Sequence, residues 1–312
     1  MAGTIKAVYA SEPNFTAGEN FAGAVRYPIS GYQVDAIGGE PTVGELAAYL
    51  IAAGIPGNPE MRFGCQLRAS ALDTVTLYRC NGAHIFINGI NYPIPIAGAP
   101  LLSSGLSVDT LYYVYAKLGS VVELEASTTA PTADATYGHQ IKTGDASRSY
   151  VGMIYPLDLG GNPTIYDDST RRMVATHYNR VSKYVERTGG LLADRTTASS
   201  VIVELSTAER LKYLLHPAVD QGAVSFYFSV SVKSAAMGNI IGAQIYANGG
   251  GGVGQPILIH SPRANYAVNI AGRTGGVFNG GYNFISLGGR SSDSQLVTFN
   301  QSNSIFGAEF QI

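Results

Sequence analysis

From residue 61 onward, apolar and polar residues alternate with a period of two, which is the pattern of β-strands that bury one face. The strands expected between residues 61 and 157 are Met61–Ser70, Thr74–Asn81, the two halves of 83–94, then 106–116, 120–126 and Tyr150–Tyr155. Asn88-Gly89 separates two apolar runs within 83–94, and this dipeptide favours the positive φ angles of a tight hairpin turn. Residues 61–157 are therefore predicted to form a β-sandwich or a small barrel.

The same alternation returns in the last third of the chain, in short runs separated by glycine, asparagine and serine. The strands expected there are Val201–Leu205, Leu211–Leu215, Val224–Val232, Ile240–Ala247, Pro256–His260, Tyr266–Ile270, Tyr282–Leu287, Gln295–Phe299 and Phe306–Ile312. Many short strands at this spacing are typical of all-β sandwiches. Residues 191–312 are therefore predicted to form a jelly-roll-like β-sandwich.

The segment between these two regions, residues 158–190, is interpreted as a connector. Asp168 is expected to cap one or two helical turns that end near Val174, because aspartate is a favoured helix N-cap. The stretch His177–Val185 is more typical of a strand.

The first 60 residues are predicted to form an N-terminal arm with one short helix. Lys6–Ala10 is the pattern of a short strand. Thr42 and Glu45 form a capping box, and Gly54 is a plausible C-terminal stop, so a helix is expected between them. The fold class that follows is all-β, with two β-sandwich (jelly-roll-like) domains preceded by this arm. The predicted boundaries are 1–60, 61–157, 158–190 and 191–312.

Composition excludes several classes of protein. Of the 312 residues, 46% are hydrophobic and only 13% are charged, which argues against a coiled coil and against intrinsic disorder. The net charge is −2, so no electrostatic attraction to nucleic acid is expected. No apolar run approaches the roughly 20 residues that span a bilayer, and the first residues lack a signal-peptide pattern. We therefore expect synthesis as a soluble chain in the cytoplasm, without membrane insertion.

Motifs for metals and cofactors are weak. Cys65 and Cys80 are expected to be free, partly buried thiols, and two cysteines without a nearby histidine pair do not form a zinc site. The histidines are His84, His139, His177, His216 and His260, and no two have a metal-ligand spacing. The glycine-rich run 248–254 is followed by a strand pattern and not by the helix that a dinucleotide site requires, so a hairpin is expected. No metal-ligating or cofactor-binding residue is assigned.

Catalytic candidates are limited to two pairs of carboxylates, Glu123 with Glu125 and Asp167 with Asp168. A glycosidase needs two such groups on either side of its substrate. Glu123 and Glu125 are expected to lie on the solvated face of a hairpin, with Val122 and Leu124 inward. Adjacent aspartates point apart on a strand. No catalytic residue is therefore assigned, and the chain is predicted not to be an enzyme.

Tyrosine is abundant in the middle of the chain. The residues concerned are Tyr112, Tyr113, Tyr115, Tyr150, Tyr155, Tyr166, Tyr178 and Tyr184. Tyrosines of this kind either stack on sugars at an interface or simply pack on a half-buried sheet, and the second interpretation is the more ordinary one.

Several segments resemble a family of known proteins. They are Gly105–Tyr115, Leu124–Pro131, Ile141–Ile154, Tyr178-Asn179-Arg180 after the pair Arg171-Arg172, and Gly281–Arg290. This pattern resembles structural proteins of tailed bacteriophages of the tail fibre, head fibre and spike type, over residues 100–312. The motifs of these proteins carry structure and not chemistry, so the resemblance implies no catalytic residue.

The resemblance implies a non-enzymatic virion protein, a fibre, spike or decoration subunit, located in the virion. Residues 1–60 are expected to bind other virion proteins of the capsid, portal or tail, and the C-terminal β domain is expected to face outward for host attachment. An alternative is a carbohydrate-binding module that recognises a host surface glycan through the loops Asn248–Gly254 and Gly272–Gly281. A polysaccharide-degrading spike enzyme is the least favoured alternative.

Assembly as a homotrimer is also expected. Strands with few charges leave apolar faces and edges that a monomer seldom exposes, and closed symmetry covers them. Phage spikes and fibres are commonly trimeric, which is an implication of the resemblance. The strands Tyr112–Tyr115 and Val224–Val232 are the predicted seam between subunits.

Overall fold

A computed structural model describes the strands Thr4–Tyr9, Val25–Ile29 and Tyr32–Ile37, and beyond them residues 63–189, 191–216 and 223–311. The chain divides into two compact units, Met1–Arg62 and Phe63–Ile312. In the first unit, β1 (Thr4–Tyr9), β3 (Tyr32–Ile37) and β2 (Val25–Ile29) form an antiparallel sheet in that order. The strand expected at Lys6–Ala10 is therefore confirmed, and the helix expected between Thr42 and Gly54 lies outside the described residues.

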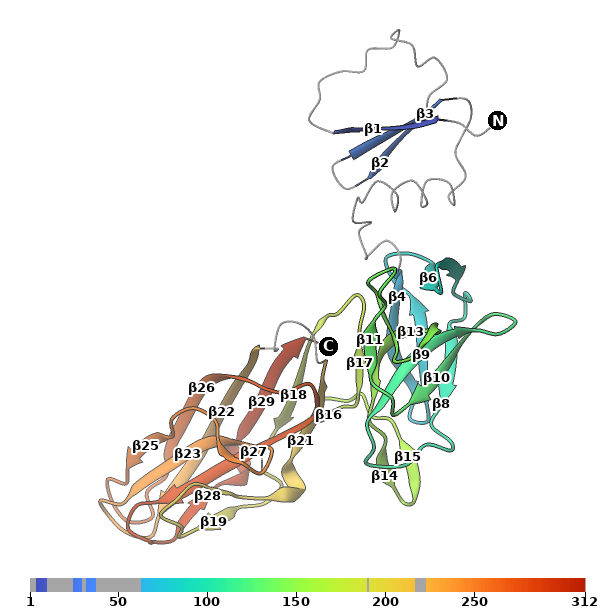
Figure 1. Ribbon diagram of the computed structural model, residues 1–312. Coiled ribbons are helices and arrows are strands. Elements are labelled where there is room, and N and C mark those ends of the chain that lie inside the picture. The colour runs from blue at the N-terminus through green and yellow to red at the C-terminus, as the bar shows by residue number, and fades with distance from the viewer. Residues whose placement is uncertain are drawn as a thin grey trace. The chain divides into compact units, whose positions relative to one another are not determined.

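The first part of the second unit is called the N-terminal β body. It is formed by the strands from β4 (Cys65–Ala71) to β15 (Asn162–Thr164) together with β17 (Val174–Thr176) (Figure 1). One sheet has the order β4 (Cys65–Ala71), β5 (Thr74–Arg79), β8 (Ala99–Leu102). A larger sheet has the order β10 (Val122–Ser127), β9 (Tyr112–Leu118), β13 (Asp145–Ile154), β12 (Gln140–Lys142), β11 (Pro131–Ala133), with β17 (Val174–Thr176) also on β13. Two hairpins complete the body, β6 (His84–Ile87) with β7 (Ile90–Pro93) and β14 (Leu157–Leu159) with β15 (Asn162–Thr164).

Two further sheets form the C-terminal β body, which consists of β16 (Arg171–Arg172) and the strands from β18 (Ser182–Thr188) to β29 (Ile305–Gln311) (Figure 1). The first has the order β16 (Arg171–Arg172), β21 (Leu211–Leu215), β27 (Gly281–Ser291), β23 (Ile240–Ala247), β24 (Gly251–Gly252), with β20 (Val203–Glu204) on β27 and β25 (Ile257–His260) on β23. The second has the order β18 (Ser182–Thr188), β29 (Ile305–Gln311), β22 (Ala223–Ser234), β28 (Val297–Phe299), β19 (Arg195–Thr197), with β26 (Val268–Val277) on β22.

The all-β fold class is confirmed. The helical segments in the described part of the chain are two single 3-10 turns, η1 (Thr207–Glu209) and η2 (Gln301–Asn303). No described helix is long and apolar enough to cross a bilayer. Local chemistry explains the hairpin at Asn88-Gly89, where φ is 47° and 84° and Ile87 pairs with Ile90.

The segment 158–190 joins the bodies through strands and not through helical turns. β16 pairs in parallel with β21, β17 pairs with β13, and β18 pairs with β29. The helical turns predicted after Asp168 are wrong. The Asp168 carboxylate instead accepts hydrogen bonds from the backbone N–H groups of Thr170 and Arg171, which closes a turn before β16.

One hydrophobic core extends across the boundary between the bodies. Tyr115, Tyr150 and Met153 of the N-terminal body belong to the same buried cluster as Leu211 and Tyr213 of the C-terminal body. A second core, which includes Phe63, Leu77 and Val114, lies within the N-terminal body. Most of the clustered tyrosines therefore serve packing, although Tyr184 of β18 keeps 53% of its surface exposed.

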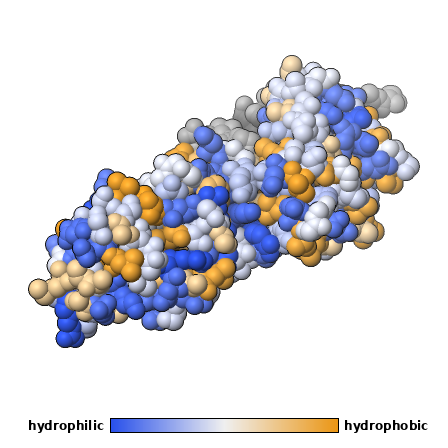
Figure 2. Space-filling view, turned by 90° about the horizontal axis from the view of Figure 1, so that it is seen from below, coloured by the Kyte–Doolittle hydropathy of each residue, from blue (hydrophilic) through white to orange (hydrophobic). Residues whose placement is uncertain are grey.

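The predicted subunit seam is largely internal to the chain. Tyr115 is fully buried, and in β22 the alternate residues Val224, Phe226 and Phe228 are buried in the core. β22 is also bonded along both edges, to β26 on one side and to β28 and β29 on the other. A contact with a second subunit would therefore have to be made by residues other than these buried ones. Figure 2 shows apolar groups on the drawn face as small clusters separated by polar residues.

The glycine-rich stretch Gly272–Gly281, predicted as a loop, is for the most part strand β26. A Cβ atom at Gly272 would lie 2.8 Å from Cε1 of Phe228, and one at Gly276 would lie 2.8 Å from Cε2 of Phe278. These two glycines let the strand backbone approach aromatic rings, which is a role that composition alone does not distinguish from a turn. The hairpin expected at 248–254 is confirmed by the pairing of β23 with β24.

Candidate functional site

A cleft lies between β4 and β17 in the N-terminal body. Each is an edge strand of its own sheet, and among the described residues no backbone–backbone hydrogen bond joins the two. The backbone N–H of Leu67 instead donates to Oγ1 of Thr176 at 3.1 Å. The cleft has a volume of about 240 Å³. Its lining residues are Gln66, Leu67, Arg68, Ala69, Asp167, Val174, Thr176, Val181 and Lys183.

Arg68 forms one side of this cleft. Alternation along β4 places Gln66 and Arg68 on the same face, and Nε of Arg68 donates to Oε1 of Gln66 at 2.6 Å. Gln66 is 4% exposed and is itself held, because its Nε2 donates to the carbonyl oxygen of Asn179. Arg68 forms no ion pair with any carboxylate of the described part of the chain. Its guanidinium is therefore oriented but not neutralised.

Asp167 forms the opposite side together with two cations. Its Oδ1 lies 2.9 Å from Nη1 of Arg172, and its Oδ2 lies 3.7 Å from Nζ of Lys183. Nε of Arg172 also donates to the carbonyl oxygen of Tyr184, which ties this group to β18. The lining itself holds Arg68, Lys183 and Asp167, a net charge of +1, and Arg172 pairs with Asp167 without lining the cleft.

The remaining walls are apolar or already bonded. Leu67 and Val174 are buried, whereas Val181 is 43% exposed at the mouth. Oγ1 of Thr176 accepts a hydrogen bond from Leu67 and donates its proton to the carbonyl oxygen of Tyr178, so it has no proton left to donate to a ligand. The site combines charged side chains with the apolar side chains of Leu67, Val174 and Val181.

The side chain of Asn179 binds backbone carbonyl groups of a neighbouring segment of the same chain. Its φ is 52°, a left-handed conformation that asparagine tolerates well. Its Nδ2 lies within 3.2 Å of the carbonyl oxygens of Phe63, Cys65 and Cys80, at the start of β4 and just after β5. Tyr178 stacks on Phe63 with ring centroids 4.0 Å apart. The motif Tyr178-Asn179-Arg180 therefore has a structural role here.

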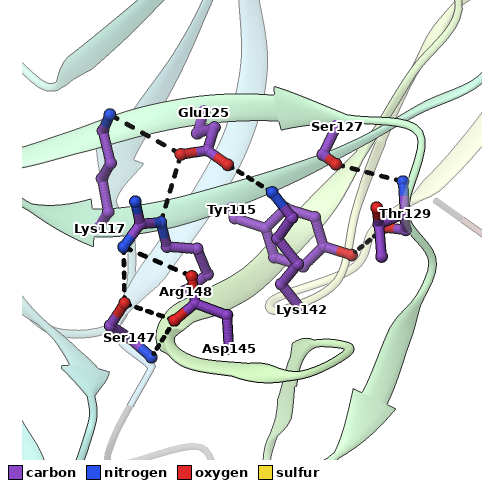
Figure 3. A network of polar contacts seen from close by, with 9 residues as sticks. All are labelled: Tyr115, Lys117, Glu125, Ser127, Thr129, Lys142, Asp145, Ser147 and Arg148. Carbon is purple, nitrogen blue, oxygen red and sulfur yellow. Dashed lines mark hydrogen bonds and ion pairs between the residues drawn. The ribbon is translucent and has the colours of Figure 1, made fainter.

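The sequence-predicted carboxylates do not form a catalytic pair. Val122 and Leu124 are buried as expected, and Glu125 lies in a polar network (Figure 3). Its two oxygens contact Nζ of Lys142 at 2.7 Å and Nε of Arg148 at 3.2 Å. The hydrogen bond from Lys142 is the largest of the effects that lower the pKa of Glu125. A general acid must keep its proton near neutral pH, so this arrangement does not suit that role.

The other candidates are distributed through the structure. Asp167 lines the cleft, whereas Asp168 closes its own turn, so the two adjacent carboxylates do not act together. Cys65 and Cys80 are free thiols, as predicted, and burial raises the pKa of Cys65. His177 and His216 meet at the junction of the two bodies. No group of three or more His, Cys, Asp or Glu side chains is arranged for a metal within the described ranges.

Sequence reasoning did not identify the cleft. Leu67 and Thr176, whose hydrogen bond joins its two edges, are 109 positions apart. Arg68 and Lys183 look like ordinary solvated charges of two separate strands. No local motif marks them, because the site arises from two strand edges that meet only in the folded chain.

Comparisons with known proteins add little. No family model and no curated protein matches the chain. Among solved structures, the insecticidal delta-endotoxin Cry8Ea1 from Bacillus thuringiensis has a TM-score of 0.26 at 8% identity, over 80% of this chain and 52% of that one. A structure of infectious bursal disease virus, Gx strain, has a TM-score of 0.25 at 11% identity, over 93% of this chain and 71% of that one. The infectious bursal disease virus VP2 subviral particle has a TM-score of 0.23 at 11% identity, over 100% of this chain and 80% of that one.

These neighbours thus come from viral particles and from a toxin. The chain spans about half of the endotoxin's length, 52%. At such scores the likeness carries no functional argument.

Proposed function

We propose that the chain is a non-enzymatic structural subunit of a bacteriophage virion, of the fibre, spike or decoration type. The observation that best supports this is how the segments that resemble virion proteins fold. They form β9, β10, β13 and β27, and their side chains pack in cores. A segment used for architecture has this property, whereas a catalytic segment brings polar groups together in a cleft.

In this proposal residues 1–60 bind other virion proteins, of the capsid, portal or tail, and the C-terminal β body faces outward. The charge of the chain fits such a division. Residues 1–60 carry six acidic and two basic groups, a net charge of −4, whereas the whole chain has a net charge of −2. A homotrimer is part of the same proposal, because few charges guard the strand faces and edges.

The experiment that tests this function uses phage particles assembled with the full chain or with a chain that lacks residues 1–60. The number of copies per particle is measured by quantitative mass spectrometry. We expect the full chain in purified particles and a loss of most copies of the shortened one. Equal incorporation of both would contradict the anchoring role, and absence of the full chain from particles would contradict the virion function.

The oligomeric state is tested separately on purified protein. Light scattering is expected to give about three times 32.8 kDa for the full chain. A stable monomer at micromolar concentration would contradict the trimer and leave the virion role to the incorporation experiment.

A further inference from the structure

The lining of the cleft between β4 and β17 contains two cations, Arg68 and Lys183, and one carboxylate, Asp167. Arg68 has no carboxylate partner in the described part of the chain, and the pair between Lys183 and Asp167 is long, at 3.7 Å. Arg172 already neutralises Asp167 at 2.9 Å. An incoming anion therefore meets two cations, Arg68 and Lys183, and a carboxylate whose charge is largely compensated.

Arg68 is also prepared for such a contact. Only its Nε is used, in the hydrogen bond to Gln66, and no hydrogen bond from its two Nη groups occurs within the described residues. A guanidinium held in one orientation loses less conformational entropy when it binds, and its planar fork matches the two oxygens of a carboxylate.

The interior of the cleft limits the rest of the ligand. Its volume of about 240 Å³ is below the roughly 300 Å³ at which small-molecule sites usually begin, so the ligand is small. Leu67, Val174 and Val181 offer apolar surface, while Thr176 is already bonded. A neutral sugar would leave the charges of Arg68 and Lys183 without a counter-charge from the ligand.

We propose that this cleft binds a small organic carboxylate with a compact apolar body. The carboxylate lies between Arg68 and Lys183, and the apolar body lies against Leu67, Val174 and Val181. This assignment depends on the cleft alone, so it and the virion role are tested separately.

The test measures binding to the full-length protein by calorimetry and by chemical-shift changes of labelled methyl groups. The probe is 3-methylbutanoate. Its neutral amide tests the need for charge, and glucuronate tests whether a polyhydroxylated body is accepted. We expect saturable binding of 3-methylbutanoate with shifts at Val181, no binding of the amide, and weaker binding of glucuronate.

Arg68→Gln is expected to weaken binding of 3-methylbutanoate by about tenfold or more, since a charge-assisted hydrogen bond is lost. Arg273→Gln is the matched control, because Arg273 is also an exposed strand arginine whose Nε bonds a single polar side chain, that of Ser225. Lys183→Gln provides a second variant on the other side of the cleft. Loss of binding in the two cleft variants and not in the control supports the proposal.

Three results would overturn it. They are no saturable binding up to about 10 mM, equal binding of the amide, and equal loss of affinity in Arg273→Gln. Tighter binding of glucuronate than of 3-methylbutanoate would overturn the apolar body and reassign the cleft to acidic sugars. Thermal unfolding of each variant is followed in parallel, so that a folding defect in Arg68→Gln shifts the decision to Lys183→Gln.

Discussion

Nδ1 of His177 and Nε2 of His216 lie 3.1 Å apart, so two histidines from different β bodies share one hydrogen bond at the junction. The ring of Tyr150 packs against both, with centroid distances of 4.9 Å and 5.5 Å. One nitrogen of the pair must donate and the other must accept, which requires that the accepting ring is neutral. Burial is the main cause that lowers the pKa of His177 to about 4 and that of His216 to about 2, and Arg180 adds to both effects.

The first prediction is a loss of stability in mild acid. An unfolded histidine has a pKa near 6.5, so below this pH the unfolded chain binds protons that the folded chain excludes. The stability contributed by this pair is complete above about pH 6.5 and is lost as the pH falls toward 4 and below. The free energy of unfolding should fall by at most about 1.4 kcal/mol per pH unit for each histidine. Urea unfolding at pH 7 and pH 5 measures the change.

The double variant His177→Gln, His216→Gln is the control for this effect. Glu125 and Asp168 also have lowered pKa values, but carboxylates of this kind lose their contribution only below their unfolded pKa near 4. Between pH 6.5 and pH 5 the two histidines therefore outweigh these carboxylates. An identical pH dependence in the wild type and the double variant over this interval would show that the pair does not control stability.

The second prediction concerns Asn179. Asn179→Ala removes an amide that contacts the carbonyl oxygens of Phe63, Cys65 and Cys80, and alanine tolerates a φ of 52° poorly. We expect a loss of about 2–3 kcal/mol in the free energy of unfolding. Asn179→Gly separates the two causes, because glycine adopts this φ freely. If the glycine variant is as stable as the wild type, the amide contributes nothing and only the backbone conformation matters.

The hairpin and the cleft illustrate what the sequence can predict. Asn88-Gly89 was predictable because the turn depends on the φ preferences of two adjacent residues. The cleft was not, because Arg68 and Lys183 belong to strands that local patterns describe separately. The hydrogen-bonded histidine pair could not be predicted for the same reason, because 39 positions separate His177 from His216. Periodicity predicts elements, whereas contacts between distant elements depend on how sheet edges meet.

The predictions of a helix cap at Asp168 and of a loop at Gly272 were wrong for a different reason. Asp168 was expected to cap a helix, yet the same hydrogen bonds to backbone N–H groups also close a single turn before a strand. Gly272 was expected in a loop because glycine is common in turns, although a missing side chain serves equally where a strand approaches a ring. In both cases the local chemistry was recognised, and the tertiary surroundings determined its use.

The third prediction follows from Gly272. In Gly272→Ala the new Cβ would lie 2.8 Å from Cε1 of Phe228 and 2.9 Å from Cγ1 of Ile257. We expect a loss of about 1–3 kcal/mol, the usual effect of overpacking. Gly275→Ala on the same strand is the matched control, because its Cβ would meet only the carbonyl oxygen of Val224 at 3.7 Å. Denaturant unfolding should separate the two variants, and equal stabilities would show that Phe228 moves away without cost.

The fourth prediction concerns a buried carboxylate in the C-terminal body. Glu209 is 1% exposed, and its Oε1 accepts hydrogen bonds from Nη2 of Arg195 at 2.7 Å and from the backbone N–H of Leu192 at 2.8 Å. Among the residues that the structure describes, its Oε2 has no hydrogen-bond partner. Arg195→Ala would leave this charge buried and uncompensated, so we expect a loss of about 3 kcal/mol or more.

Two comparisons test whether the buried charge of Glu209 causes the loss of stability in Arg195→Ala. Adding Glu209→Gln to Arg195→Ala removes the buried charge while the hydrogen bond to Leu192 stays available, so part of the lost stability should return. Lys117→Ala breaks a pair with Glu125 that is 3.8 Å long and about a quarter to a third exposed, and should cost less than about 1 kcal/mol. A double variant no more stable than Arg195→Ala alone would mean that Arg195 stabilises the fold through packing and not through the charge of Glu209.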